Sequence, residues 1–139
     1  MKKSEQNGQF NVVLLGIVFD PEKRKILIGK KESDSQIKKL VWAFPGGRPK
    51  YGEEIEDTLK RKIELKTGLK VENLGSIFSR THKENPGFLL IYHLCEVVGG
   101  KEKPGDDIVE LKWVKPEELE RYFTTSFHPH LKEYIMNLK

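Results

Sequence analysis

The chain has 139 residues, of which 37% are apolar and 33% are charged, and it carries a formal net charge of +4. This length is typical of one compact domain that buries its own core, so we expect a single domain over residues 1–139 and, with Cys95 as the only cysteine, no internal disulfide. No apolar run approaches the roughly 20 residues that span a bilayer, which predicts a cytoplasmic protein without a membrane partner.

The first half of the chain predicts three strands and a helix. Two runs of β-branched and apolar residues flank the turn signal Asp20-Pro21 and predict a hairpin. Ile55, Leu59 and Ile63 recur at helical spacing. The predicted strands lie at 11–19, 26–29 and 40–44, and the predicted helix lies at 53–66 and ends at Thr67-Gly68.

The second half predicts three more strands and two helices. The strand at 87–98 is apolar on both faces and is therefore expected to be central. Pro116 and Pro129 suit the first turns of the two helices. The other predicted elements are strands at 74–80 and 109–114, a polar loop at 99–107, and a helical stripe of Leu131, Tyr134, Ile135 and Leu138. The order βββαβββαα predicts an α+β domain, a mixed sheet with helices on both sides in an α/β/α sandwich.

Two glycines stand between the third strand and the first helix. Gly46 and Gly47 allow the backbone to approach a ligand, and the helix N-terminus behind them presents free N–H groups to an anion such as diphosphate. A glycine pair alone is equally a feature of a tight turn. The spacing around the pair carries more information than the pair itself.

That spacing resembles the box of the Nudix (MutT-like) family, G-x5-E-x7-R-E-U-x-E-E-x-G-U, where U is a bulky aliphatic residue. The chain departs from the pattern at Lys62, Leu65 and Lys66, where the family has glutamate. It matches at Gly47, Glu53, Arg61, Ile63, Gly68 and Leu69. The resemblance, which extends to the flanking "WAFPGG" and "KPEEL" segments, implies the Nudix fold, magnesium or manganese as cofactor, and hydrolysis of nucleoside diphosphate derivatives.

The three departures change the chemistry that the resemblance implies. Divalent cations of this kind prefer oxygen ligands, and carboxylates at i, i+3 and i+4 share one helix face. Lys62, Leu65 and Lys66 offer no oxygen there. We therefore expect no metal site on this face, and Mg or Mn only if the protein is active. The two ammonium groups can instead neutralise a diphosphate directly.

Acids elsewhere leave alternatives open. Glu53 is a weak catalytic candidate. Asp106, Asp107 and Glu110 stand where family members sometimes recruit an extra base or ligand, but a solvated turn before an edge strand is the favoured interpretation of these three acids. Glu64 points away from the site and is expected to pair with Lys60 or Arg61. Arg61 is expected to pair with Asp57. The predicted ligand-binding residues are Gly46, Gly47, Arg48, Lys62, Lys66 and Glu110.

The histidines and the cysteine have simpler interpretations. His93 lies in the central strand and is expected in the core or cleft wall, and His128 precedes Pro129 at a helix start. Neither these residues nor His82 and His130 show a metal-ligand spacing. Cys95 lies in an apolar run, which is typical of a buried, unreactive thiol.

Three functions therefore remain. The first is a Nudix-fold protein that binds a nucleoside diphosphate-linked ligand and whose standard magnesium-dependent pyrophosphohydrolysis is lost or strongly reduced. The second is an active hydrolase of a nucleotide sugar or ADP-ribose-like substrate that uses acids from elsewhere in the cleft. The third is a protein or RNA interaction module, for which the pI of about 9.1 is the only support. We expect a nucleotide-type small molecule as partner, no nucleic acid, and a homodimer as one possible assembly.

Overall fold

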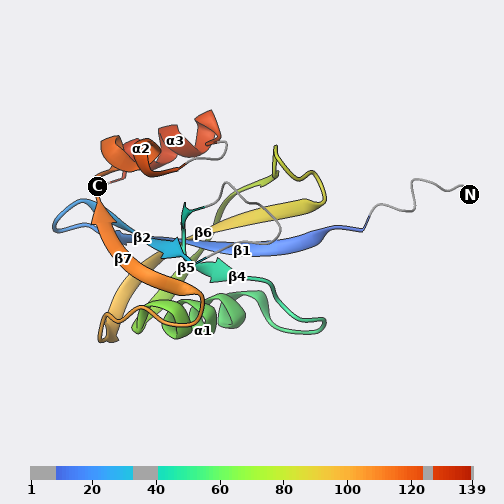
Figure 1. Cartoon of the computed structure of the whole chain (residues 1–139), viewed down its shortest axis with the longest axis horizontal. Coiled ribbons are helices and arrows are strands. Elements are labelled where there is room, and N and C mark those ends of the chain that lie inside the picture. Colours follow the sequence, from blue (N-terminus) through green and yellow to red (C-terminus); the bar gives the residue numbers. More distant parts are fainter. Residues whose placement is uncertain (1–8, 33–40, 124–126, 139) are drawn as a thin grey trace, which may run out of the picture.

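The computed structural model describes residues 9–32, 41–123 and 127–138 (Figure 1). Its strands are β1 (Asn11–Asp20), β2 (Lys25–Lys31), β3 (Trp42–Ala43), β4 (Gly46–Gly47), β5 (Leu69–Thr81), β6 (Phe88–Gly100) and β7 (Ile108–Val114). Its helices are α1 (Ile55–Thr67), the 3-10 helix η2 (Pro116–Glu118), α2 (Leu119–Tyr122) and α3 (Pro129–Met136). None of the described helices combines the length and the hydropathy that a membrane span requires.

The sheet is mixed, and its neighbour order is β3-β2-β1-β6-β5. β1 runs parallel to β6 from Asn11↔Phe88 to Val18↔Cys95, and β6 pairs with β5 in antiparallel fashion on its other side. The predicted hairpin of β1 and β2 and the central place of β6 are therefore confirmed. β7 pairs with β2, and the short β4 pairs with β1.

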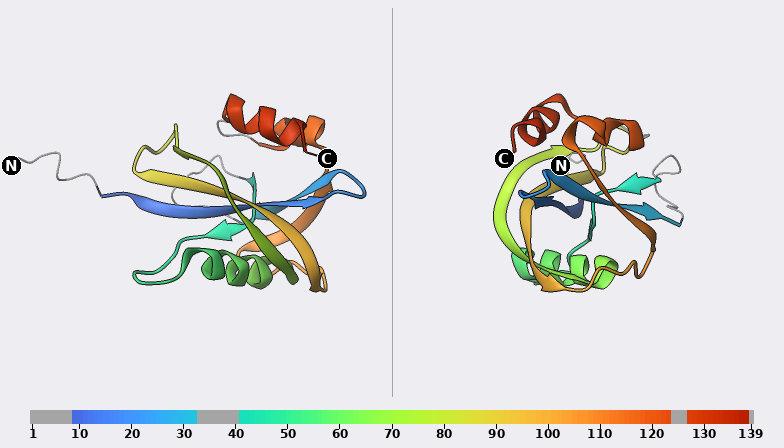
Figure 2. Two further views of the ribbon diagram at one scale, coloured as in Figure 1. Left: turned by 180° about the vertical axis from the view of Figure 1, so that it is seen from behind. Right: turned by 90° about the vertical axis from the view of Figure 1, so that its left-hand side faces the viewer.

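Helices cover the sheet on both sides, as predicted: α1 lies below it and α2 and α3 lie above it in the view of Figure 1, and Figure 2 shows the same separation from two other directions. Each side has its own apolar core. The α1 side buries Leu14, Val18, Leu27, Leu59, Ile63, Leu69, Val71 and Cys95. The α2 and α3 side buries a larger set that includes Ile17, Ile28, Phe44, Tyr92, Leu131 and Ile135.

Helix α1 packs closely on β1. Two of its side chains, Leu59 and Ile63, are fully buried. Gly16 on β1 leaves room for Ile63, because a Cβ at position 16 would lie 2.6 Å from Ile63 Cδ1. The helix begins at Ile55, two residues later than predicted, since the Glu54 side chain caps it by accepting a hydrogen bond from Glu56 N. Ile55 itself is 39% exposed, so the predicted apolar stripe begins one turn later, at Leu59.

The structure corrects the limits of several elements. β5 begins at Leu69 instead of residue 74, because it pairs with a β6 that continues to Gly100. The predicted strand at 40–44 is confined to β3 in the described residues, with residue 40 outside them. Gly46 and Gly47 form β4. The two glycines therefore belong to the sheet and do not form a free tight turn.

The polar segment after β6 is attached to the C-terminal end of α1. Lys101, Lys103 and Gly105 donate backbone hydrogen bonds to the carbonyl oxygens of Gly68, Thr67 and Lys66 at 3.0, 2.8 and 3.0 Å. Such carbonyl groups have no partner within the helix. The predicted polar loop thus supplies the cap of α1 and places Asp107 beside this helix.

Candidate functional site

The strand β4 brings the two glycines of the predicted ligand site against β1. Gly46 pairs with Leu15 and Gly47 pairs with Leu14 in an antiparallel ladder. A Cβ at Gly46 would lie 1.9 Å from the carbonyl oxygen of Leu14, so no other residue fits there without moving the backbone. The close approach that requires glycine at this position is the approach of β4 to β1.

Lys62 lies directly against this short strand. A Cβ at Gly47 would be 3.0 Å from Lys62 Cδ and 3.4 Å from Lys62 Cε, so the alkyl chain of the lysine covers the backbone of Gly47. The structure therefore brings together two of the predicted ligand-binding residues, one from the glycine segment and one from the helix of the motif. The Lys62 side chain is partly exposed.

Lys66, one turn further along α1, belongs to an ion cluster. Its Nζ lies 3.3 Å from Asp107 Oδ1, and Lys31 Nζ from the end of β2 lies 3.6 Å from Asp107 Oδ2. The two lysine side chains are only 12% and 19% exposed. Asp107 is thus not merely part of a solvated turn. Sequence reasoning did not find Lys31, because no local pattern indicates that β2 ends beside Asp107.

Glu53 has a defined set of partners. Its Oε1 accepts a hydrogen bond from Lys50 N at 2.6 Å, and its Oε2 lies 2.6 Å from Arg61 Nη2. The hydrogen bond from Lys50, with the Arg61 charge, lowers the pKa of Glu53 although partial burial acts in the opposite direction. The predicted pairing of Arg61 with Asp57 is replaced by this contact, because Glu53 precedes the helix and folds back over Arg61.

The ion cluster of Lys31, Lys66 and Asp107 does not include Leu65 or the other acids that the sequence analysis considered. Glu64 Oε2 is 3.8 Å from Lys70 Nζ instead of meeting Lys60 or Arg61. Leu65 is 56% exposed. Asp106 is exposed with a left-handed φ of 53°, which suits a tight turn. Glu110 is exposed on β7 opposite Lys30, three residues after Asp107.

Arg48 is directed to another part of the molecule. Its Nη1 donates to Asn11 Oδ1 at 3.4 Å, and its guanidinium lies 5.2 Å from the centre of the Phe88 ring. Asn11 and Phe88 begin β1 and β6. Of the predicted ligand-binding residues, Gly47 and Lys62 are therefore in contact, whereas the contacts of Arg48 lie at the start of the central strands.

The residues present do not fit a divalent cation of the kind that the box implies. Positions 62, 65 and 66 offer two ammonium groups and an alkyl chain. Each nearby acid with a defined contact already faces a cation, Glu53 facing Arg61 and Asp107 facing Lys31 and Lys66. Within residues 9–32, 41–123 and 127–138, no group of three His, Cys, Asp or Glu side chains could hold a metal ion.

A buried histidine, His93, lies on β6 opposite Gly16 of β1. His93 is 3% exposed, and its Nδ1 is 3.1 Å from Asn73 Oδ1. Asn73 Oδ1 also accepts from Gly75 N at 2.9 Å, so His93 Nδ1 carries the proton. Burial lowers the pKa of His93, with Glu56 acting in the opposite direction. The prediction of a core residue is confirmed, but the sequence did not indicate Asn73 as its partner.

Two further predictions about single residues are confirmed. Cys95 is 1% exposed, and burial raises the pKa of its thiol to about 12. His128 caps α3 by accepting a hydrogen bond from His130 N at 3.1 Å. The His128 ring packs on Phe78 at a centroid distance of 4.7 Å.

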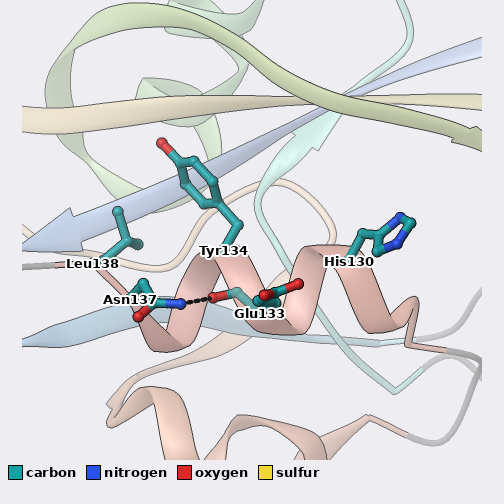
Figure 3. Close-up of a pocket in the computed structure, with 5 residues that line it drawn as sticks. All are labelled: His130, Glu133, Tyr134, Asn137 and Leu138. Atoms are coloured by element: carbon teal, nitrogen blue, oxygen red, sulfur yellow. Dashed lines mark hydrogen bonds between the residues drawn. The ribbon is translucent and has the colours of Figure 1, made fainter.

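A surface depression of about 480 Å³ runs along α3 (Figure 3). It is lined by His130, Glu133, Tyr134, Asn137 and Leu138. Figures 1 and 2 place α3 on the other side of the sheet from α1. Volume alone does not identify a site, and this depression is remote from the charged residues of α1, so we place the candidate site at Gly47, Lys62, Lys66 and Asp107.

Comparison with known proteins identifies relatives over most of the chain. A family model described as the NUDIX domain matches residues 10–138. An ADP-ribose pyrophosphatase of Methanocaldococcus jannaschii is 34% identical over 92 residues, which cover 64% of this chain and 53% of that protein. A mouse protein named nucleoside diphosphate-linked moiety X motif 6 is 37% identical over 76 residues, 55% of this chain and 23% of that protein. The chain spans about half or less of the length of these curated relatives.

Solved structures share the fold. A NUDIX hydrolase from Nitrosomonas europaea superimposes with a TM-score of 0.74 at 16% identity, over 91% of this chain and 70% of that chain. An ADP-ribose pyrophosphatase from Streptococcus suis gives a TM-score of 0.59 at 20% identity, over 77% of this chain and 75% of that chain. The predicted fold class is confirmed by these similarities.

Proposed function

The chain belongs to the Nudix family, and from this premise we propose that it binds a nucleoside diphosphate-linked ligand and that standard magnesium-dependent pyrophosphohydrolysis is lost or strongly reduced. One observation carries the proposal. One of the three helix positions at which the box has glutamate is filled by Lys66, whose ammonium lies 3.3 Å from the nearby carboxylate of Asp107. A second cation, Lys62, lies one turn away beside Gly47.

The type of ligand is argued from these charges and from the relatives. Ammonium groups form charge-assisted hydrogen bonds with phosphate oxygens, and the Lys62 side chain extends from α1 beside the backbone of Gly47. Relatives of this chain are named for ADP-ribose and for nucleoside diphosphate-linked compounds. A diphosphate that links a nucleoside to a second group is therefore the ligand class that we propose, with Lys62 as its main cation and Lys66, whose ammonium is paired with Asp107, beside it.

The second candidate function is an active hydrolase, and the name of the M. jannaschii relative favours it. It would use Glu53 with Asp106, Asp107 or Glu110, and Mg or Mn as cofactor. Glu53 and Asp107 are the acids with the best defined positions, but Arg61 and Lys66 lie within ion-pair distance of them. A metal ion would have to displace these side chains before it could bind, so we place this function second.

One assay separates the two functions. Purified protein is incubated with ADP-ribose, nucleotide sugars and nucleoside triphosphates in the presence of Mg²⁺ or Mn²⁺, and product release is followed by chromatography. We expect no metal-dependent turnover above that of a Lys62→Met/Lys66→Met variant. Turnover that requires metal and is abolished by Glu53→Gln would contradict the proposal and establish the hydrolase.

Binding is measured separately, by titration calorimetry in EDTA. We expect ADP-ribose or a nucleotide sugar to bind the unchanged protein, and Lys62→Met to weaken binding about tenfold, which corresponds to about 1.4 kcal/mol. Lys60→Met, which removes an exposed lysine from the same helix, is the matched control and should bind normally. Absence of binding by every nucleotide in the panel would favour a protein or RNA interaction module. The oligomeric state is a separate question, and light scattering would test for a homodimer.

A further inference from the structure

Lys66 differs from an ordinary surface lysine in its burial. Its side chain is only 12% exposed although it projects from the charged side of α1. Lysine side chains are rarely buried to this degree without a partner. The partner is Asp107, which follows α1 by about forty residues in the sequence and reaches it through the segment that caps the helix end.

Asp107 is held in place by contacts of both its backbone and its carboxylate. Its backbone oxygen accepts a hydrogen bond from Glu32 N at 3.0 Å, and Gly105, two residues earlier, donates to Lys66 O at 3.0 Å. Its Oδ2 lies 3.6 Å from Lys31 Nζ. Its Oδ1 is buried and has no hydrogen bond of good geometry within the described residues, so Lys66 Nζ at 3.3 Å compensates it by charge.

We propose that the Lys66 ammonium is a built-in cation, which neutralises Asp107 at the place where a glutamate at position 66 and Asp107 would together hold a divalent metal ion. The Asp107 side chain as a whole is 36% exposed, but its Oδ1 is buried, and a buried carboxylate oxygen without a compensating cation is unfavourable. An ammonium group and a metal ion are alternative solutions to the same requirement. This inference concerns the ligand-free protein, and it does not depend on the proposed ligand binding.

Reversing one charge should convert the cluster into a metal site. In Lys66→Glu two carboxylates face each other, with Lys31 as the remaining cation of the cluster, so we expect the melting temperature in EDTA to fall by roughly 5 °C. Carboxylate oxygens are the ligands that Mn²⁺ prefers. Because a ligand that binds only the folded state stabilises it, millimolar Mn²⁺ should raise the melting temperature of Lys66→Glu by several degrees.

Two matched variants define what the metal binds. Lys60→Glu makes the same charge change at an exposed position of α1 and should show no comparable stabilisation by Mn²⁺. Lys66→Glu/Asp107→Asn removes the second carboxylate and should abolish the stabilisation. The unchanged protein should not be stabilised by Mn²⁺. Calorimetric titration with MnCl₂ alone gives the stoichiometry, which we expect to be one ion per chain in Lys66→Glu.

Several results would overturn the inference. Equal effects of Mn²⁺ on Lys66→Glu and Lys60→Glu would show that the metal responds only to net charge. A stabilisation that survives Asp107→Asn would assign the metal to other residues. If Lys66→Glu does not fold in EDTA, the readout becomes the folded fraction after refolding with Mn²⁺ or with EDTA, measured by circular dichroism. No recovery with Mn²⁺ would then refute the built-in cation.

Discussion

The contact between Gly16 and Ile63 gives a quantitative prediction about how α1 is seated on the sheet. In Gly16→Ala the new Cβ would lie 2.6 Å from Ile63 Cδ1, whereas carbon atoms in ordinary contact are about 3.5–4.0 Å apart. β1 cannot easily retreat, because Gly16 N donates to Pro45 O at 2.8 Å and β1 is paired with β6 along its length. The overlap must therefore be relieved mainly at Ile63.

The magnitude follows from the two opposing contributions. Overpacking of a core by one methyl group costs about 1–3 kcal/mol, and replacing glycine in a strand with alanine recovers about 0.5–1 kcal/mol. Gly16→Ala should therefore lower the free energy of unfolding by about 0–2.5 kcal/mol, with a central value of about 1 kcal/mol. Ile63→Val alone should cost about 0.5–1.5 kcal/mol. Valine lacks Cδ1, so the double variant should be more stable than the sum of the single effects by about 1 kcal/mol.

Urea unfolding of the four proteins in this cycle measures the coupling directly. Gly99→Ala serves as the control, because a Cβ at Gly99 would meet no atom within 4 Å, and its effect should add to that of Ile63→Val. Additivity of Gly16→Ala and Ile63→Val within about 0.5 kcal/mol would refute the steric explanation. A change in the slope of the unfolding curve would indicate instead that the unfolded chain had changed.

Three other predictions concern buried polar groups on the α1 side. The Oγ1 of Thr67 donates a hydrogen bond to Ile63 O at 2.7 Å and accepts one from Leu69 N at 3.1 Å. Thr67→Val removes both bonds and should lower the free energy of unfolding, measured in urea, by about 1–3 kcal/mol. Thr67→Ser keeps the hydroxyl and should lower it less. Because burial lowers the pKa of His93, the folded protein binds fewer protons than the unfolded chain. The free energy of unfolding should therefore fall as the pH drops below 6.5, the ordinary pKa of histidine, and should stop falling once the pH is below the pKa of His93 in the folded state. The slope should be at most about 1.4 kcal/mol per pH unit. The reactive form of a cysteine is the thiolate. Because the pKa of Cys95 is raised to about 12, its thiol should not react with a thiol reagent at pH 8 unless the protein unfolds.

Each of these has a clear contrary result. Equal costs for Thr67→Val and Thr67→Ser would show that the hydroxyl bonds contribute nothing. An acid-dependent loss of stability that persists unchanged in His93→Gln would have to come from other groups. Rapid labelling of native Cys95 under conditions where urea unfolding is negligible would show that the strand opens locally.

Much of the fold could be predicted because the signals are local. Ile17, Ile28 and Tyr92 lie in apolar runs whose direction in the core follows from strand alternation. The start of β5 was missed although Leu69 and Val71 alternate with exposed Lys70 and Glu72, because four residues beside a helix end are too short a pattern to distinguish from a loop. The length of β5 is set by its pairing with β6, which is a tertiary effect.

The site was predictable only in its sequence spacing. The box located Gly47 and Lys62, and the structure places them in contact. The cluster around Lys66 depends on Lys31 and Asp107, which approach from the ends of two strands that are distant in sequence. Helix geometry alone predicted the pairing of Glu64 within the helix, but Lys70 lies beyond the helix end and competes for it.

Backbone hydrogen bonds join Lys101, Lys103 and Gly105 to the end of α1, and they limit insertions and deletions in the segment between β6 and β7. Surface connections usually accept inserted residues at small cost. Here the hydrogen bond from Lys103 N to Thr67 O fixes the spacing on both sides of the segment. An insertion between Gly100 and Asp107 would shift donors away from the helix carbonyl groups and move Asp107 along α1. This loop should therefore tolerate substitution of its exposed side chains but not a change in its number of residues.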